Sequence, residues 1–496
     1  MPTIIRVLLV TLILYTVFAC ESKQKKEERL AKQYCGSCHA FPDPNLLDKK
    51  TWNHGVLPQM ALRLGHDYSL IGSINEADQK EALKTLPDHA MVTDEEWESI
   101  RNYFLTHAPD SLKVSTQNIT QLIQQFEVTP YRLPITTPPL ITLLLTDTLN
   151  HKIYLGNRYS RLYQLNEKFT LEDSFQLGSP PSKMLFQKNA DPLLLLMGIM
   201  DPNDRMKGEL TQLRLSDRTL NPLIDSMKRP VHFEEVDLNN DNLKDFVVCE
   251  FGNYTGALTA YEKEGNGIFN KHFLLNLPGA RKVIVKDFDH NGLMDVMALM
   301  SQGDEKIVLL YNQGNFNFRI TTLLQFPPVY GSSFFDIVDF NNDGKFDILY
   351  SNGDNADYSI ILKPYHGVRI FLNDGNNQFT ESWFYPMNGA SQVVAKDFDR
   401  DGDFDIAAIS FFQDFTTHSE QSFIYFENSG KNFIPQITPL ASSGRWLTMD
   451  ASDIDHDGDT DILLGALNFN SGVPTELSTR WSKEKTSVLI FRNKLK

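Results

Sequence analysis

The sequence predicts a small helical domain followed by an all-β propeller. Helix-forming patterns occupy the N-terminal part, and Asp-rich segments recur about every fifty residues from residue 237 onward. Strand-like runs follow each of these segments, which is typical of propeller blades rather than of helical repeats. A chain of 496 residues is also too long for one ordinary hydrophobic core, so we expect at least two domains.

Residues 1–20 have the composition of an export signal. Arg6 precedes an apolar run, residues 7–18, that is too short to remain as a membrane-spanning helix. The run ends in Val17-Phe18-Ala19-Cys20, which resembles the lipobox of bacterial lipoproteins. This resemblance implies a lipid on Cys20 and a membrane-anchored protein in the periplasm or on the cell surface. The alternative is a plain secretory signal, but residues 21–27 form a polar tether of the kind that a lipid anchor needs.

Cys35-Gly36-Ser37-Cys38-His39 is the attachment pattern of a c-type haem. Two thiols about one turn apart add to the two vinyl groups, and the histidine is placed as the proximal iron ligand. A redox dithiol and half of a zinc site are the alternatives, but no second Cys-x-x-Cys lies nearby to complete a zinc site. We expect one covalent haem c held by Cys35, Cys38 and His39. Cys249 lies in a strand-like run and is expected to be a buried core residue.

Residues 28–110 resemble a small cytochrome c domain. A helix over residues 28–33 leads into the haem motif, and Thr93-Asp94-Glu95-Glu96 is a capping sequence that opens a second amphipathic helix. That second helix resembles the C-terminal helix of cytochromes c. Residues 111–139 are expected to be a linker, because its second half is rich in proline.

Met60 is the favoured distal haem ligand. Its segment, residues 52–60, resembles the ligand segment of bacterial haem domains that are fused to repeat propellers. Met91, just before the last helix, is the second candidate, and an open site remains possible. Methionine ligation favours electron transfer, whereas an open iron site permits ligand chemistry. The remaining candidates are four histidines: His54, His66, His89 and His107.

Five Asp-rich segments share one spacing. Oxygen-bearing side chains stand at positions 1, 3, 5 and 9, and position 6 is glycine in all but the first copy, which has Asn242. Oxygen ligands with several carboxylates favour Ca²⁺, and the first three positions match the start of an EF-hand loop. Turns that bind no ion are the alternative. We therefore expect up to five Ca²⁺ ions. The predicted ligands are Asp237, Asn239, Asp241 and Asp245; Asp287, Asp289, Asn291 and Asp295; Asp339, Asn341, Asp343 and Asp347; Asp397, Asp399, Asp401 and Asp405; and Asp453, Asp455, Asp457 and Asp461.

These segments resemble the FG-GAP or VCBS repeats of integrin-like propellers, a resemblance that covers roughly residues 130–496. Residues 251–257, Phe-Gly-Asn-Tyr-Thr-Gly-Ala, are loosely similar to the FG-GAP motif itself. The resemblance implies seven blades in a propeller spanning residues 140–496, with calcium loops in only some of them. Two early blades without a loop, near residues 141–165 and 193–213, complete the seven.

Three functions from different classes remain open. The favoured one is electron transfer by a membrane-anchored, extracytoplasmic haem protein, whose propeller binds a redox partner. The first alternative is a haem-dependent oxidoreductase with substrate on the propeller face, although no catalytic motif was found. The second is a surface module that binds glycans or proteins. The net charge of −16 argues against nucleic acid as a partner.

One further recurrence indicates a docking face. A small-residue pair precedes the strand that enters several calcium loops, as in Gly279-Ala280 and Gly389-Ala390. Equivalent loops of a propeller gather on one face, so Arg281, Gln392, Arg445 and Trp446 are expected to converge there. The alternative is that small residues are needed where the inner strands crowd together.

Overall fold

The chain divides into two compact units. One comprises the residues up to Leu70 together with Leu86–Ser111, and the other comprises Ile71–Thr85 together with Leu112–Lys496. The structure, a computed structural model, describes residues 22–114, 117–188, 190–355, 360–430 and 432–495. The predicted lipidation site, Cys20, lies outside these residues. Within the described part of the chain, no helix is both long and apolar enough to cross a membrane.

The first unit is helical. Its helices are α2 (Lys23–Cys35), α3 (Lys49–Thr51), α4 (Leu57–Arg63) and α6 (Asp94–His107), with a 3-10 turn at Pro44–Leu46 and a π-helical turn at Trp52–Val56. Helix α2 begins before the expected residue 28, because the Ser22 side chain accepts a hydrogen bond from the Lys25 N–H and caps it. Residues 23–27, expected to be a tether, are therefore helical.

Helices α2 and α6 pack against each other. Thr93 and Glu96 form the predicted capping box at the start of α6. Lys26 Nζ contacts Glu95 Oε1 at 2.8 Å, and the Tyr34 hydroxyl donates to Glu96 at 3.3 Å. The apolar side of α6 is buried, and Phe104 packs on Trp52 with ring centroids 4.5 Å apart.

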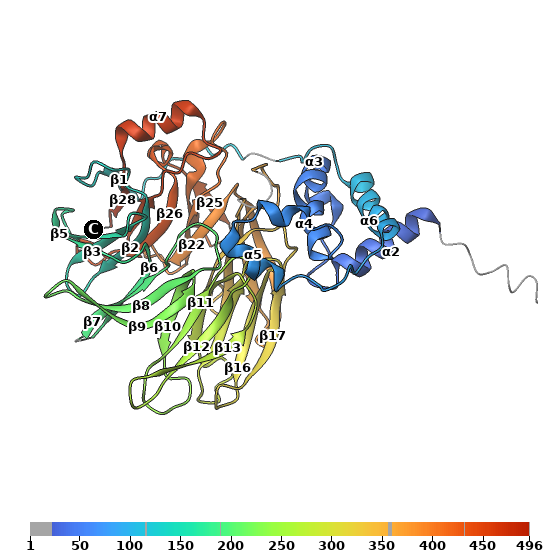
Figure 1. The fold of residues 1–496 in the computed structure, drawn as a ribbon. Coiled ribbons are helices and arrows are strands. Elements are labelled where there is room, and N and C mark those ends of the chain that lie inside the picture. Colours follow the sequence, from blue (N-terminus) through green and yellow to red (C-terminus); the bar gives the residue numbers. More distant parts are fainter. Residues whose placement is uncertain (1–21, 115–116, 189, 356–359, 431, 496) are drawn as a thin grey trace, which may run out of the picture. The chain divides into compact units, whose positions relative to one another are not determined.

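The second unit is a seven-bladed β-propeller (Figure 1). Each blade is a four-stranded antiparallel sheet. The first three blades are β2 (Ile141–Asp147), β3 (Lys152–Asn157), β4 (Arg161–Asn166) and β5 (Leu171–Gln176); β6 (Pro181–Gln187), β7 (Ala190–Leu196), β8 (Met206–Arg214) and β9 (Thr219–Lys228); and β10 (Pro230–Val236), β11 (Asp245–Glu250), β12 (Ala257–Lys263) and β13 (Phe269–Leu275). The next three are β14 (Ala280–Lys286), β15 (Asp295–Met300), β16 (Lys306–Asn312) and β17 (Phe318–Gln325); β18 (Ser332–Val338), β19 (Asp347–Asn352), β20 (Gly367–Asn373) and β21 (Phe379–Pro386); and β22 (Ala390–Lys396), β23 (Asp405–Ser410), β24 (Phe423–Asn428) and β25 (Phe433–Gln436).

The last blade joins both ends of the propeller sequence. It contains β26 (Trp446–Ser452), β27 (Asp461–Ala466), β28 (Val488–Asn493) and β1 (Phe126–Tyr131), and β1 pairs antiparallel with β28. The propeller therefore begins at about residue 126, and the expected start at residue 140 and linker over residues 111–139 are corrected accordingly. Proline in this stretch misled the prediction, since an edge strand tolerates Pro130 where a central strand would not.

The blades share one pattern of burial. The first strands lie next to one another around the ring. In the five blades with Asp-rich loops, the second strands are buried along their whole length; these strands are β11, β15, β19, β23 and β27. Their apolar runs reflect this position, because neighbouring blades cover both faces of each strand. Cys249 lies on β11 and is fully buried, as predicted.

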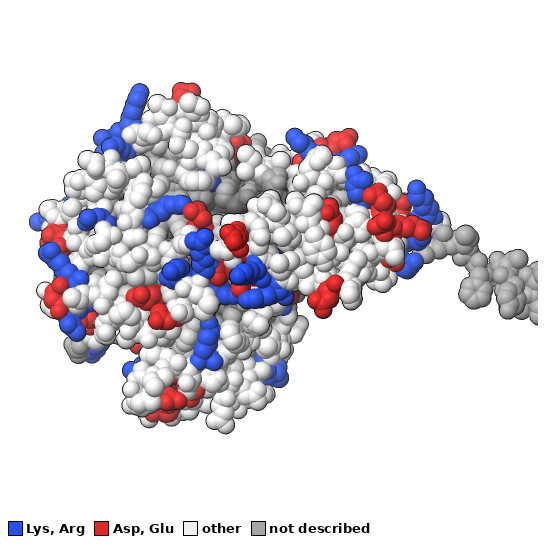
Figure 2. Space-filling model, viewed as in Figure 1, with Lys and Arg blue, Asp and Glu red and all other residues white. Residues whose placement is uncertain are grey.

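Two helices accompany the blades. Helix α7 (Thr475–Glu484) precedes β28, and α5 (Glu76–Leu83) belongs to the segment Ile71–Thr85. The expected haem domain over residues 28–110 is thus interrupted by a segment that packs with the propeller. On the face drawn in Figure 2, acidic and basic side chains lie side by side.

Candidate functional site

The haem motif follows directly on the end of helix α2. Cys35 is the last residue of the helix, and the Gly36 N–H bonds back to the Lys32 carbonyl at 3.0 Å. Cys35 is buried while Cys38 is exposed. The chain therefore presents one thiol from the helix end and the second from the turn that follows it.

The His39 ring is oriented by a backbone hydrogen bond. Its Nδ1 lies 2.9 Å from the Ala40 carbonyl oxygen, so Nδ1 carries the proton. A bond of this kind fixes the tautomer of metal-ligating histidines and leaves Nε2 as the ligand atom. The donor set of two thiols and this imidazole fits a covalently attached haem.

The buried Cys35 thiol does not fit the reactive thiol of a redox dithiol. Burial, with a smaller contribution from Cys38, raises the pKa of the Cys35 thiol to about 12. Reactive Cys-x-x-Cys pairs instead have one thiol whose pKa is lowered.

The candidate distal ligands differ in burial. Met60 is half-buried on α4, directly after the π-helical turn Trp52–Val56, and such turns often mark functional positions. Met91 is 46% exposed. His66 lies beside Trp97 with its ring tilted and has its Nε2 3.1 Å from Asp94, whereas its Nδ1 is buried and has no hydrogen-bond partner. His66 is thus the strongest alternative to Met60 within the described residues.

The five Asp-rich loops have the same backbone. Each connects the first strand of its blade to the second, so all five open on one face of the propeller. Position 6 has a positive φ in every loop, and Asn242 reaches 67° where the others have glycine. Position 4 also has a positive φ, which the sequence analysis did not anticipate; its occupants are Asn240, His290, Asn342, Arg400 and His456.

The position 9 aspartates hold the loops to the blades. In the fifth loop, Asp461 accepts the Ile454 N–H at 3.0 Å and the Asn493 N–H at 2.8 Å. The other four loops repeat this pair of bonds. Burial raises the pKa of Asp461 to about 7 and that of Asp405 to about 6. These residues were predicted only as ion ligands, but they also brace the strands.

The fourth and fifth loops fit a cation best. In the first three loops, Oδ1 of the position 1 aspartate accepts the N–H of position 5. Oδ1 of Asp397 and Oδ1 of Asp453 are instead buried without a hydrogen-bond partner. Asp459 adds two more such oxygens beside Asp457, and burial raises its pKa to about 6. A bound Ca²⁺ would satisfy oxygens of this kind.

Carboxylate clusters occur in three of the loops. Ligand oxygens lie within 4.8 Å of one another in Asp287/Asp289/Asp295, Asp397/Asp399/Asp401 and Asp453/Asp455/Asp461. In the third loop Asp343 forms an ion pair with Lys345 at 3.3 Å. The predicted sites therefore differ in how well they suit a cation, although their spacing in the sequence is the same.

Three of the four residues named for the expected docking face are engaged within the propeller instead. Trp446 is fully buried and donates to the Ala441 carbonyl, and Arg445 is buried against Phe411 and Phe412. Gln392 bonds to the backbone of Met449 in the neighbouring blade. Close packing of the inner strands explains the small residues instead, because a Cβ on Gly389 would lie 2.2 Å from the backbone of Phe412.

A carboxylate network that the sequence analysis missed holds residues 251–257. Asp204 accepts the N–H groups of Asn253, Tyr254 and Thr255 at 2.9–3.0 Å. Asp78 of α5 in turn accepts the Asp204 N–H at 3.1 Å. No local signal identifies these partners, because they lie far apart in the sequence.

A family model matches part of the propeller sequence. A model of an FG-GAP-like repeat matches residues 237–298, 287–350 and 352–408, which include the first four loops. Similar solved structures include the N-terminal domain of Nup159 (12% identity, TM-score 0.45, 77% of this chain and 99% of that one). Others are the Neurospora crassa Pan2 WD40 domain (11%, 0.46, 76% and 98%) and the Pseudomonas aeruginosa periplasmic gluconolactonase PpgL (12%, 0.41, 62% and 86%). No curated protein matches the sequence.

Proposed function

We propose that this chain is a membrane-anchored, extracytoplasmic c-type haem protein that transfers electrons, and that its FG-GAP-repeat propeller binds a redox partner. The observation that carries the proposal is the haem motif at the end of α2, with the His39 ring oriented by the Ala40 carbonyl. When bound, the haem supplies a one-electron centre. Cys35 and Cys38 hold it covalently, and His39 Nε2 is the proximal ligand.

The distal side decides between electron transfer and catalysis. We propose Met60 as the ligand, because it follows a π-helical turn that displaces the helix from regular geometry. A thioether ligand raises the reduction potential and fills the coordination position against small molecules. An unfilled position would favour the oxidoreductase function.

An optical redox titration of the haem-loaded mature protein, with and without carbon monoxide, tests the proposal. We expect a low-spin spectrum, a positive potential and no response to carbon monoxide. Met60→Ala should convert the spectrum to one that responds to carbon monoxide, whereas Met91→Ala should leave it unchanged. If the spectrum responds to carbon monoxide in His66→Gln and not in Met60→Ala, His66 is the ligand. Carbon monoxide binding by the unaltered protein would refute the electron-carrier proposal.

The propeller is proposed to depend on Ca²⁺. The orphaned oxygens of Asp397 and Asp453 support this for the fourth and fifth loops. Because an ion that binds only the folded state stabilises it, chelation should lower the melting temperature by several degrees. Asp453→Asn should reduce the drop in melting temperature caused by chelation more than Asp237→Asn does. The reason is that both oxygens of Asp237 already accept N–H groups. A melting temperature that is indifferent to chelation would contradict the calcium assignment.

A further inference from the structure

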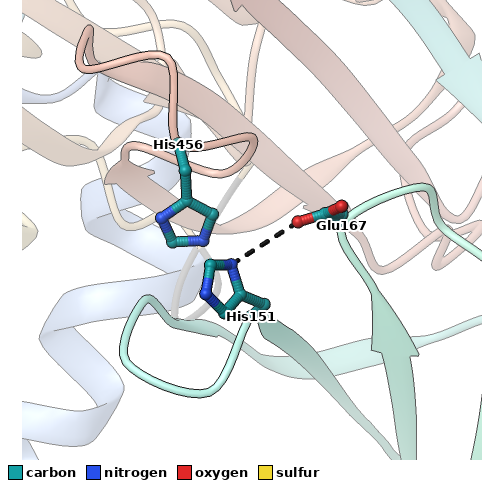
Figure 3. A group of neighbouring side chains, drawn as sticks. All are labelled: His151, Glu167 and His456. Atoms are coloured by element: carbon teal, nitrogen blue, oxygen red, sulfur yellow. Dashed lines mark ion pairs between the residues drawn. The ribbon is translucent and has the colours of Figure 1, made fainter.

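The seam between the first and last blades brings together three side chains that the calcium loops do not explain. His151 lies in the turn between β2 and β3, Glu167 lies between β4 and β5, and His456 occupies position 4 of the fifth loop (Figure 3). The β2–β3 turn is the first blade's counterpart of a calcium loop. His151 and His456 therefore meet because equivalent loops are neighbours around the ring.

The three side chains are arranged as a set of metal ligands. His151 Nδ1 lies 3.5 Å from Glu167 Oε2. The rings of His151 and His456 have centroids 3.7 Å apart and are tilted by 55°, so they are not stacked. One ligand atom from each residue lies within 4.8 Å of the others. In a tetrahedral zinc site ligand atoms are roughly 3.4 Å apart, which small side-chain rotations would reach.

We propose that His151, Glu167 and His456 bind one Zn²⁺ ion. Two imidazoles and one carboxylate are a donor set that zinc prefers, whereas Ca²⁺ is bound by oxygen alone. The site is accessible, with the side chain of His151 54% exposed and that of Glu167 38% exposed. Three protein ligands leave the fourth position of the ion to water.

The position of the site gives the ion a structural role. Both ends of the propeller sequence meet in the last blade, where the pairing of β1 with β28 closes the ring. A Zn²⁺ ion at the seam ties the first blade to the last directly. Arg492 pairs with Asp455 of the fifth loop at 3.5 Å.

His290 provides a matched control. It occupies position 4 of the second loop with φ 58°, against 62° for His456. Among the described residues it belongs to none of the His and carboxylate groups that are close enough to share an ion. Loop geometry alone therefore does not create the site, and the seam supplies the other two ligands.

Isothermal titration of the full mature protein with Zn²⁺, at saturating Ca²⁺, tests the proposal. We expect a saturable site whose affinity falls at least about tenfold in His151→Gln and in Glu167→Gln, and is unchanged in His290→Gln. Neither His151 nor Glu167 belongs to a calcium loop, so these two variants separate the seam from the loops. Zinc held by the Cys35 and Cys38 thiols would be the same in every variant.

Two further measurements make the result decisive. Co²⁺ in place of Zn²⁺ should give the visible absorption of a tetrahedral site in the unaltered protein and in His290→Gln, but not in His151→Gln. Zn²⁺ should also raise the melting temperature of the same two proteins only. Equal affinity in the seam variants and in His290→Gln would mean adventitious binding and would overturn the proposal, as would the absence of saturable binding.

Discussion

Gly252 and Asp204 show how single residues set the turn of residues 251–257. Gly252 has φ 63°, and a Cβ there would lie 1.7 Å from the Thr255 carbonyl oxygen. The tight turn directs three consecutive N–H groups at Asp204. The sequence motif indicated a special turn, but not the carboxylate that it encloses.

Replacing Gly252 by alanine should cost far more stability than the same change at Gly303. Gly303 lies in the equivalent turn of the next blade with φ 68°, and a Cβ there meets nothing within 4 Å. Gly303→Ala should cost about 1–2 kcal/mol, the cost of a left-handed backbone. Gly252→Ala adds a backbone clash and the loss of the Asp204 bonds, so we expect a loss well above that. Denaturant unfolding at saturating Ca²⁺ measures both, and equal losses would refute this account.

The loops show where residue-level prediction succeeded and where it stopped. The spacing predicted the turn at position 6, and Asn242 adopts it because asparagine tolerates a positive φ. The spacing could not reveal that Asp461 accepts the N–H of Asn493, because that partner is 32 residues away. The spacing also could not predict which of the five loops suits a cation best, because the loops differ in which carboxylate oxygens lack a hydrogen bond.

At the scale of elements, α5 is the helix whose contacts are hardest to predict from the sequence. It looks like one more short helix of the first domain, yet its Asp78 and Glu81 contact residues 126 and 147 positions away. Glu81 Oε2 lies 2.7 Å from Lys228 Nζ and accepts the Thr255 hydroxyl at 3.1 Å. Intrinsic helix propensity accounts for the formation of α5, but it does not identify the residues that α5 contacts. In contrast, α6 was predicted well, because its capping box and apolar face are local.

The ion pair of Glu81 with Lys228 predicts how the free energy of unfolding depends on pH. Hydrogen bonds from Lys228 and Lys84 lower the pKa of Glu81 to about 2 from its ordinary value of 4.5. The stabilisation is therefore complete above pH 4.5 and is lost as the pH falls toward 2. Glu81→Gln should lower the free energy of unfolding by about 1 kcal/mol at neutral pH. Glu76→Gln, an exposed change in the same helix, is the control.

Unfolding curves of both variants at neutral and acidic pH check this dependence. The deficit of Glu81→Gln relative to the unaltered protein should shrink below pH 4.5, and Glu76→Gln should show none at either pH. A deficit that persists unchanged at pH 3 would mean that the charge of Glu81 is not what holds α5.

At the scale of the whole molecule, the repeats predicted seven blades but not how the ring closes. The resemblance to FG-GAP propellers implies seven blades, and five loops with two early strand pairs account for them, because most blades are local units of consecutive strands. Closure is not local, since β1 pairs with β28 at the other end of the chain. The prolines before residue 140 predict a linker, and the strand β1 in this stretch is recognisable only from its partner β28.

Closure of the ring should depend on Phe126 of β1. Its buried ring packs on Phe398, Tyr425 and Phe491, with centroids 5.3–6.1 Å away. Phe126→Ala should cost about 3–5 kcal/mol, the usual cost of removing a buried phenylalanine. Phe273→Ala, on an outer edge strand where the ring is 60% exposed, should change stability by less than about 0.5 kcal/mol.

The two alanine variants are compared in the full chain by denaturant unfolding and size-exclusion chromatography. Phe126→Ala should also favour dimers or larger species, because a displaced β1 leaves the edge of β28 unpaired and open to another chain. Two variants of equal stability would mean that the last blade stands without β1. The pairing of β1 with β28 would then add little to the stability of the closed ring.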